Sequence, residues 1–590
     1  MLGALSQGTN GATSEACRDA QADARSAIER AGVGSAIARL AAFIAESAPQ
    51  PPNRQPPPAA TYLAAPLDLI EFEPLNTPDS ARQRATNPEP SYGAIDSLWT
   101  DYLDLNEQLQ AALSGVSQAQ SERLHALLPR LLPRTSNGED LETLADGVIV
   151  VEIDNTLDHG ALQRLSHSLV MRSDLETVGR LKTLFDEPPP VSPPGATENR
   201  AIGEIIHADQ RDGHTLLVGG PGDNVYTGTA SIIIDLGGDD HYALAPPDGL
   251  RIVIDFAGDD THTGQSAGAV LGASLLVDAA GNDTYAAGPI SLGAAVAGVG
   301  VLVDHAGDDV YHGTELVQGA ALIGTGTLID GQGNDVYTAT KFGQGFGGAR
   351  GTGRLLDRAG DDRYVAGGRF PSSYGTPGRF QAFSQGVGMG FRGTIAGGSG
   401  MLLDASGNDR YRSGNFSQGT GYFLGLGVLD DRAGNDMYTG SRYAQGAAAH
   451  VGVGLMRDAG GNDRYSGEVS ATQAAAWDQA LALLLDCGGD DDYTADEFAL
   501  AAAAQNAIAI FVDTTGKNSY TAERDARGHT GPTDYYDAGD ELGNVAMFLD
   551  GETPAQARSP AGVASPPRSI ASSRTLAWPW LTRFEELETR

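Results

Sequence analysis

Between about residues 200 and 550, small and aliphatic residues alternate in short runs that each end in an aspartate. Examples are GVGVLVD at 298–304, GTGTLID at 324–330 and GVGLMRD at 452–458. A hydrophobic period of two is typical of a β-strand, and the small residues favour a narrow, closely stacked core. Glycine and aspartate separate the runs, so this region is predicted to contain many short strands joined by turns.

A helical pattern precedes the strand-rich region. Residues 13–47 carry Ala, Glu, Arg and Leu at helical spacing and stop at the proline-rich stretch APQPPNRQPPPAA. Further helical segments are expected near 94–132 and 161–185, before the second breaker PPPVSPPG. The predicted organisation is an N-terminal helix within 1–47, a proline-rich linker at 48–60, an α-helical region at 61–187, a second linker at 188–199, a β-solenoid at 200–550, and a spacer with a short tail at 551–590.

One eight-residue unit, D-x-x-G-[DN]-D-x-Y, occurs twelve times in the strand-rich region. The units begin at Gly219, Asp235, Asp255, Asp278, Asp304, Asp330, Asp357, Asp404, Asp431, Asp458, Asp486 and Asp513. Most steps are 26 to 28 residues, and a sustained period of this length is the signature of a solenoid. Three sides of about nine residues fit this period. We therefore predict a mainly β fold, a three-sided parallel β-helix of about 12 coils, preceded by an α-helical region.

Stacking of the coils would align each unit position in a column. All twelve units have Gly at the fourth position, eleven have Tyr at the eighth and ten have Asp at the sixth. The glycines predict a corner with positive φ that every coil repeats. Aspartates about 4.8 Å apart repel by about 0.9 kcal/mol per pair in water and about 3.5 kcal/mol at an effective dielectric of 20. Such a column needs counter-charge.

The acidity of the chain is concentrated in these units. The net charge is −37, and the 27 aspartates of the units account for all but about 10 of it. This balance argues against nucleic acid as a partner, and no apolar run is long enough to predict a membrane span. Carboxylate and carbonyl oxygens, with no thiol and few imidazoles, match calcium best. The predicted calcium ligands are Asp235, Asp240, Asp255, Asp260, Asp278, Asp283, Asp304, Asp309, Asp330, Asp335, Asp357, Asp362, Asp404, Asp409, Asp431, Asp436, Asp458, Asp463, Asp486 and Asp491.

The segment DAAGNDTY at 278–285 resembles the calcium-binding nonapeptide of the RTX β-roll family, GGxGxDxUx. The shared features are Gly at the fourth position, Asp at the sixth and a large apolar residue at the eighth. The resemblance covers about eight residues of each 27, and Asp stands in place of the first glycine. It implies calcium held between successive turns by the sixth-position Asp and backbone carbonyls, with folding triggered by calcium outside the cell.

The same corner has an alternative interpretation without metal. First-position aspartates can accept hydrogen bonds from turn N–H groups, and sixth-position aspartates can bond Tyr or backbone. Fifth-position Asn residues would then form an uncharged amide ladder. A second row lies 13 residues before the next unit and predicts stacked side-chain amides: Gln265, Gln344, Gln418, Gln445 and Gln473.

The repeat is broken by a step of 47 residues between Asp357 and Asp404. The excess lies near 365–384, and such insertions leave the wall of a solenoid as loops that often mark its binding face. Guanidinium groups beside aromatic rings suit carboxylated or sulfated sugars. The candidate ligand-binding residues are therefore Arg369, Phe370, Tyr374, Arg379 and Phe380. The alternative is that these arginines pair with the acidic corner formed by the aspartate units and keep the protein soluble.

The segment HADQRDGH brings several titratable residues together at the solenoid entrance. His207, Asp209, Asp212 and His214 are candidate transition-metal or acid–base groups, and with Arg369 and Arg379 they form the candidate catalytic set. The alternative is a capping turn with imidazoles exposed to solvent. No GxSxG, HExxH, P-loop or GxGxxG motif occurs in a strand–helix context.

Two functions from different classes stay open at this stage. The first is a calcium-binding structural, adhesive or partner-binding module whose helical N-terminal region docks a protein partner or caps the rod. The second is a β-helix lyase or hydrolase acting on an anionic polysaccharide.

Cys17 and Cys487 stand alone and predict no disulfide framework. No signal peptide is seen, and an extracellular or cell-surface location is favoured only if the fold depends on calcium.

Overall fold

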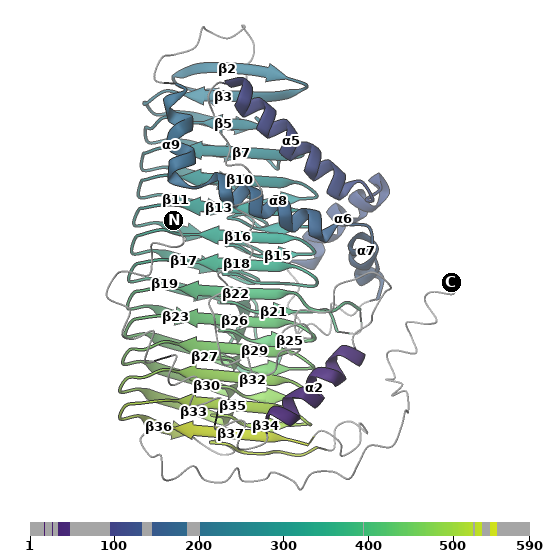
Figure 1. The fold of residues 1–590 in the computed structure, drawn as a ribbon, viewed down its shortest axis with the longest axis vertical. Helices are drawn as coiled ribbons and strands as arrows, with labels where there is room; N and C mark the ends of the chain where they lie inside the picture. The colour runs from purple at the N-terminus through teal and green to yellow at the C-terminus, as the bar shows by residue number, and fades with distance from the viewer. Residues whose placement is uncertain are drawn as a thin grey trace.

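The computed structural model describes residues 17, 26, 33–47, 95–132, 144–185, 201–392, 394–522, 526–533 and 543–551. Its strands form a parallel β-solenoid of about ten turns with a period near 27 residues, and helices lie along one side (Figure 1). The predicted fold class is confirmed. The predicted linkers at 48–60 and 188–199, and nearly all of the predicted tail at 551–590, lie outside the described residues.

Two long sheets form the main walls of the rod. The 14-stranded sheet contains β2 (Ile205–Arg211), β3 (His214–Gly219), β5 (Ile232–Ile234), β7 (Leu250–Asp255), β10 (Ala273–Asp278), β13 (Val299–Asp304), β16 (Thr325–Ile329), β18 (Thr352–Leu356), β22 (Ser399–Asp404), β26 (Leu426–Asp431), β29 (Val453–Asp458), β32 (Leu481–Asp486), β35 (Ile508–Asp513) and β37 (Val545–Asp550). The 13-stranded sheet contains β1 (Ala201–Ile202), β4 (Val225–Gly228), β6 (His241–Leu244), β8 (Thr261–Gly264), β11 (Thr284–Ala287), β14 (Val310–His312), β17 (Val336–Ala339), β19 (Arg363–Ala366), β23 (Arg410–Arg412), β27 (Met437–Ala444), β30 (Arg464–Thr472), β33 (Asp492–Ala499) and β36 (Ser519–Ala522).

A third side is built from much shorter strands. It comprises β9 (Ala269–Val270), β12 (Ala295–Val296), β15 (Ala321–Leu322), β21 (Gly388–Met389), β25 (Gly421–Tyr422), β28 (Ala448–Ala449), β31 (Ala476–Trp477) and β34 (Ala503–Ala504). The pair β20 (Gln381–Ser384) and β24 (Asn415–Ser417) forms a separate small sheet. The first units are only 16 and 20 residues apart, and the third side begins after them at β9. This is why about ten turns, and not the predicted twelve, have the full period.

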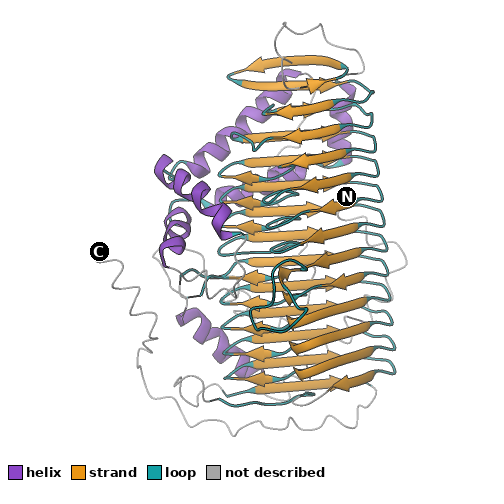
Figure 2. Cartoon of the chain, turned by 180° about the vertical axis from the view of Figure 1, so that it is seen from behind, coloured by secondary structure: helices purple, strands orange, loops and turns teal. Residues whose placement is uncertain are grey.

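The strands of successive turns pair in register. Asp278 lies beside Asp304 in the 14-stranded sheet, and Tyr285 lies beside Tyr311 in the 13-stranded sheet. The exceptions among the named strands are the antiparallel pairs β1–β4 and β2–β3, and the β2–β3 hairpin caps the first coil. Figure 2 shows the strands stacked one above another along the rod. This register aligns each position of the repeat unit in a column.

The interior of the rod is a column of aromatic rings. The eighth-position rings stack from Tyr226 to Tyr520 with centroids 4.5–5.0 Å apart. Aliphatic residues of the facing sheet, such as Leu302 and Leu328, belong to the same buried cluster. Every turn therefore adds one ring and one aliphatic side chain to a continuous core.

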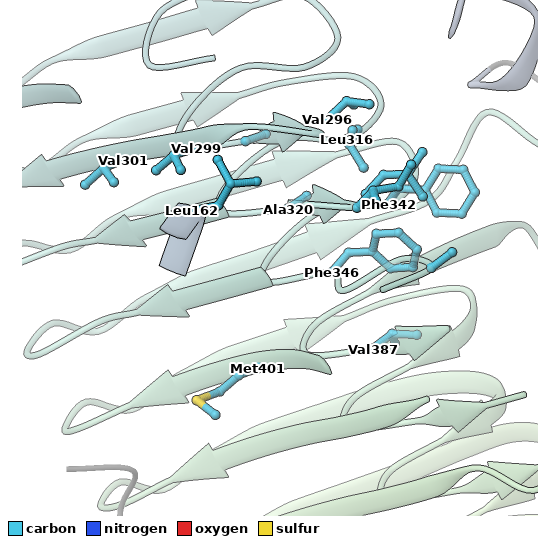
Figure 3. Packing of buried hydrophobic residues seen from close by; sticks show 14 of the residues in the cluster. Leu162, Val296, Val299, Val301, Leu316, Ala320, Phe342, Phe346, Val387 and Met401 are labelled. Atoms are coloured by element: carbon cyan, nitrogen blue, oxygen red, sulfur yellow. The ribbon is translucent and has the colours of Figure 1, made fainter. Parts of the chain in front are cut away.

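Helices cover part of the other face of the 14-stranded sheet (Figure 1). Their bounds are α2 (Val33–Ser47), α5 (Ile95–Leu113), α6 (Gln118–Leu131), α7 (Leu144–Asp154), α8 (His159–Arg172) and α9 (Leu175–Thr183). Leu162 of α8 lies beside Val299 and Val301 of β13 (Figure 3). Lys182 of α9 lies over the ring of Phe256 at 4.8 Å. The helical region thus uses its apolar surface within the chain; none of the described helices has the length and apolar character needed to cross a membrane.

A disulfide joins the two cysteines. Cys17 and Cys487 have Cα atoms 5.0 Å apart and are separated by 470 residues in sequence. The prediction that they stand alone was therefore wrong, because pairing at this separation depends on how the N-terminal segment packs on the rod, which spacing does not reveal.

Candidate metal-binding column

The first-position aspartates are hydrogen bonded from two directions. In nine units Oδ1 accepts the backbone N–H two residues later, at 2.9–3.3 Å, which is the predicted turn-capping contact. Except in Asp278, which follows the unit with His262, the other oxygen of these nine accepts a tyrosine hydroxyl from the preceding unit. These distances are 2.5–2.8 Å from the Tyr285–Asp304 pair to the Tyr465–Asp486 pair. These tyrosines thus connect one turn to the next, whereas Tyr493 and Tyr520 bond the first-position aspartate of their own unit.

The sixth-position aspartates have one bonded and one unbonded oxygen. Oδ1 accepts the backbone N–H of the sixth residue in the preceding unit, at 2.6–2.8 Å. This confirms a predicted backbone contact, whereas the predicted tyrosine contact goes to the first-position aspartates instead. Oδ2 is buried and has no hydrogen-bond partner among the described residues in any of the ten: Asp240, Asp260, Asp283, Asp309, Asp335, Asp362, Asp409, Asp436, Asp463 and Asp491.

Burial makes ionisation of these carboxyls costly. Desolvation, assisted by neighbouring carboxylates, raises the pKa of Asp335 to about 7, that of Asp283 to about 8 and that of Asp309 to about 9. Desolvation and neighbouring carboxylates also raise the pKa of the first-position Asp278 and Asp330 well above the ordinary range. The column therefore needs either protons or cations to balance its charge.

First- and sixth-position aspartates gather in clusters with ligand atoms within 4.8 Å of one another. Clusters include Asp235 with Asp240 and Asp255, Asp278 with Asp283 and Asp304, Asp309 with Asp330 and Asp335, and Asp335 with Asp357 and Asp362. Two oxygens bound to one calcium ion at about 2.3–2.6 Å can be up to about 5.2 Å apart, so this spacing fits a calcium ion. The structure thus brings the predicted ligands of consecutive units together.

The fifth-position residues form a separate, exposed ladder. Asn334 donates through its backbone N–H and its Nδ2 to Oδ1 of Asp308, at 2.8 and 3.0 Å. Asn462 makes the same two contacts to Oδ1 of Asn435. The ladder is uncharged, as predicted, only from Asn408 through Asn435 to Asn462, because elsewhere the amide donates to an aspartate. These exposed side chains are distinct from the buried carboxylate column.

The corner glycines are required for a reason other than the predicted one. Only Gly238, Gly258, Gly489 and Gly516 of this set have φ between +113° and +154°. In the coils from Gly281 to Gly461 the limit is space, because a Cβ on Gly307, for example, would lie 1.7 Å from the carbonyl oxygen of Gly281. The prediction of positive φ in every coil was therefore wrong, since the close approach of adjacent turns already excludes a side chain.

The glutamine row does not stack amide on amide. Gln344 donates through Nε2 to the carbonyl of Tyr337 in its own turn and to that of Val365 in the next, both at 3.1 Å. Gln445 makes the equivalent contacts to Tyr438 and Ser466. Gln418 and Gln473 follow the same pattern, so these four amides each join the backbones of two turns, which corrects the predicted side-chain ladder.

The insertion loop lies between β19 and β20 and uses its arginines in ion pairs. Arg369 contacts Glu315 at 2.9 Å, and Arg379 contacts Glu468 at 2.5 Å. Phe370 is buried, with the Nζ of Lys341 4.5 Å from its ring centre.

The aromatic residues of the loop differ in exposure. Tyr374 is 40% exposed beneath the guanidinium of Arg442, and Phe380 is partly buried with a backbone bridge to Pro371. The loop arginines thus pair with carboxylates of the chain, but their partners Glu315 and Glu468 lie outside the aspartate units, so the predicted pairing with the acidic corner was wrong.

The residues at the solenoid entrance belong to the β2–β3 hairpin. Asp209 accepts the indole N–H of Trp99 at 2.9 Å, and Nδ1 of His214 lies 3.0 Å from the hydroxyl of Tyr102. Asp212 occupies the hairpin turn, with φ of 49°. Burial lowers the pKa of His207, whose ring nitrogens have no hydrogen-bond partner in the described part of the chain.

This geometry makes the hairpin a docking surface for α5, because Trp99 and Tyr102 both lie on that helix. The predicted capping role is supported, although His207 and His214 are half-buried instead of exposed. The hairpin caps the first coil, while Arg369 and Arg379 leave the wall after β19, so the candidate catalytic residues come from two separate parts of the rod.

One site escaped the sequence analysis. His262 occupies the eighth position of its unit, where the other eleven units have tyrosine, and it lies in a cluster with Asp260 and Asp278. Burial lowers the pKa of His262 to about 3, so the imidazole is neutral. The signal was the single exception in an otherwise uniform column.

Comparison of the chain with family models, curated proteins and solved structures finds no match.

Proposed function

We propose that the protein is a calcium-binding β-solenoid that serves as a structural or adhesive rod outside the cell. The observation that carries this proposal is the row of ten sixth-position aspartates, each with a buried Oδ2 that lacks a hydrogen-bond partner among the described residues. A buried, unbonded carboxylate oxygen is costly. A divalent cation shared between turns would satisfy these oxygens and balance the charge of the column.

The donor chemistry favours calcium among the common cations. The four clusters named above consist of carboxylate oxygens alone. Hard oxygen donors from several carboxylates suit calcium, whose flexible coordination tolerates small differences between turns. The resemblance of the repeat corner to RTX nonapeptides also favours calcium. Every bound ion would tie adjacent turns together, so calcium would stiffen the rod along its length.

An extracellular location is supported by the disulfide. Cys17 and Cys487 form a bridge between the N-terminal segment and the rod. Disulfides persist in oxidising compartments and are rare in the cytosol. Free calcium is also abundant outside cells, so the two features suit the same environment.

The direct test is metal content and thermal unfolding of the purified full chain. After exhaustive chelation, the protein is titrated with calcium, magnesium and sodium, and bound metal is counted by mass spectrometry. We expect several calcium ions per chain and a rise in unfolding temperature specific to calcium. No bound calcium, with equal effects of sodium and calcium, would show that the buried carboxyls hold protons instead.

A matched pair of variants tests whether calcium binds at the buried sixth-position aspartates. Asp309→Asn removes one carboxylate from the column but keeps an oxygen for the backbone N–H, as Asn518 does for Asp491 at 3.0 Å. Asp308→Asn changes the adjacent exposed residue to the amide that Asn334 already provides in the next unit. We expect lower calcium content and a smaller calcium effect in the first variant only. Equal calcium content in both would rule out Asp309 as a ligand.

A second candidate function is binding of an anionic polysaccharide on the outer face of the 13-stranded sheet. Arg363, Arg410 and Arg412 line a shallow groove of about 270 Å³ there, together with Val365 and Met437. Arg363 lies directly beside Arg410 in adjacent strands, and none of the three arginines has an ion-pair partner within the described chain. An anionic ligand would relieve their mutual repulsion.

This candidate is tested with carboxylated and sulfated polysaccharides immobilised for binding measurements. Replacing Arg410 and Arg412 with alanine should weaken binding at least tenfold. Arg123→Ala on α6, which removes an exposed guanidinium elsewhere, should leave binding unchanged. Equal binding by the two variants would exclude the groove.

A further inference from the structure

The ring column contains one imidazole among the phenols. The ring of His262 stacks between Tyr242 and Tyr285, with centroids 4.5 and 4.7 Å away. The side chain is fully buried, and neither ring nitrogen has a hydrogen-bond partner among the described residues. Buried polar side chains are nearly always partnered, so two unpartnered nitrogens in one ring require an explanation.

The substitution interrupts the hydrogen bond that links turns elsewhere in the column. In the next unit, the hydroxyl of Tyr285 donates to Asp304 at 2.7 Å. At His262 the shorter imidazole leaves Nε2 3.9 Å from Oδ2 of Asp278. That distance is too long for a hydrogen bond. Oδ2 of Asp278 accordingly has no hydrogen-bond partner in the described chain either.

A third unpartnered atom completes the cluster. Oδ2 of Asp260 is buried without a hydrogen bond to any described residue, and a carboxylate oxygen of Asp260 lies within 4.8 Å of the ligand atoms of His262 and Asp278. One nitrogen and two oxygens from two consecutive units therefore surround a common point. All three residues are buried, which separates this cluster from exposed acidic groups on the surface.

We propose that Asp260, His262 and Asp278 bind one transition-metal ion, with zinc as the first candidate. Zinc bonds are about 2.0–2.1 Å to imidazole nitrogen and about 2.0–2.2 Å to carboxylate oxygen. Their sum, about 4.0–4.3 Å, is the largest separation that two ligands of one zinc ion can have, so the 3.9 Å between Nε2 and Oδ2 is within reach of a single ion. The ion replaces the missing tyrosine hydroxyl and restores the connection between the two turns.

The donor set also distinguishes this site from the rest of the column. A neutral imidazole with carboxylates suits zinc and other late first-row ions, whereas the all-carboxylate clusters suit calcium. Because the side chains are fully buried, the ion acts as a structural pin near the capped end of the rod. The inference does not depend on calcium being bound in the other turns.

The test uses the full chain with its disulfide intact. The protein is unfolded in denaturant with chelator, refolded with zinc or cobalt, and then exposed to chelator, because a buried ion must enter during folding. We expect about one zinc or cobalt per chain that resists chelation, and a visible ligand-field absorption band from the cobalt form. Absence of a retained ion in the wild-type chain would overturn the proposal.

The decisive variant is His262→Tyr, which installs the residue found at this position in the other eleven units. It should fold, lose the retained zinc and the cobalt band, and keep any calcium bound elsewhere. Asp278→Asn should also lose the ion. As a control, His312→Tyr changes an exposed histidine on β14, and this variant should retain the metal ion. Retention of the ion by His262→Tyr would refute the site, whereas failure of calcium binding alone would leave it intact.

Discussion

The hydroxyl of Tyr311 donates to Oδ2 of Asp330 at 2.5 Å, so a side chain of one turn bonds the corner of the next. The ring of Tyr311 also stacks on that of Tyr337 at 4.8 Å. Ring stacking and the hydrogen bond thus both connect adjacent turns along the axis of the rod. Because the contact repeats through most of the solenoid, the column couples the folding of neighbouring turns.

Removing this hydroxyl should destabilise the rod without disturbing the stack. Tyr311→Phe keeps the ring but leaves Oδ2 of Asp330 without its donor, at an expected cost of about 1–3 kcal/mol in the free energy of unfolding. The variants Asp330→Asn and Tyr311→Phe/Asp330→Asn complete a double-mutant cycle measured by chemical denaturation. A coupling energy of at least about 0.5 kcal/mol is expected. Strict additivity would mean that the two side chains do not stabilise each other.

Much of the rod follows from its sequence, because parallel pairing in register converts a repeat into columns. The partners within the columns were harder to predict. The tyrosine bonds the first-position aspartate of the following unit, as Tyr337 does with Asp357, and that choice depends on the reach of the phenol between turns. Packing between distant parts of the chain could not be predicted from the sequence either. Examples are the Cys17–Cys487 bridge and the hydrogen bond from Trp99 to Asp209.

The corner glycines should tolerate no side chain. On Gly307 a Cβ would lie 1.7 Å from the carbonyl oxygen of Gly281, which is backbone and cannot move aside. We expect Gly307→Ala to prevent folding or to cost more than about 4 kcal/mol. Gly288→Ala is the control, because nothing lies within 4 Å of its added Cβ. Circular dichroism and thermal unfolding compare them, and similar stability of the two variants would contradict the steric argument.

The disulfide should hold the N-terminal segment on the rod. Cys17, Ile37 and Leu40 belong to the same buried cluster as Cys487. Loss of the bridge should therefore expose this part of the chain and cost about 2–4 kcal/mol. Cys17→Ser, Cys487→Ser and the double variant should be similarly destabilised, since each removes the same bond. Limited proteolysis and thiol titration follow the change; free thiols in the untreated wild-type protein would disprove the bridge.

Lys341 should make stability depend on pH. Its ammonium group is buried between the rings of Phe342 and Phe370, and this burial lowers its pKa to about 7, despite the opposing effect of Glu315. The unfolded chain, with an ordinary pKa of 10.5 for this lysine, binds one more proton than the folded chain between these values. The penalty for charging Lys341 is thus complete below about pH 7 and falls as the pH rises, which increases stability on the order of 2 kcal/mol by pH 9.

Lys341→Met removes this dependence, so the stability difference between variant and wild type should shift in favour of the wild type from pH 6 to pH 9. Other titrating groups, including the carboxylate column, are common to both proteins and cancel in the difference. Chemical denaturation at the two pH values measures it, and a difference that is independent of pH would show that the lysine titrates normally in the fold.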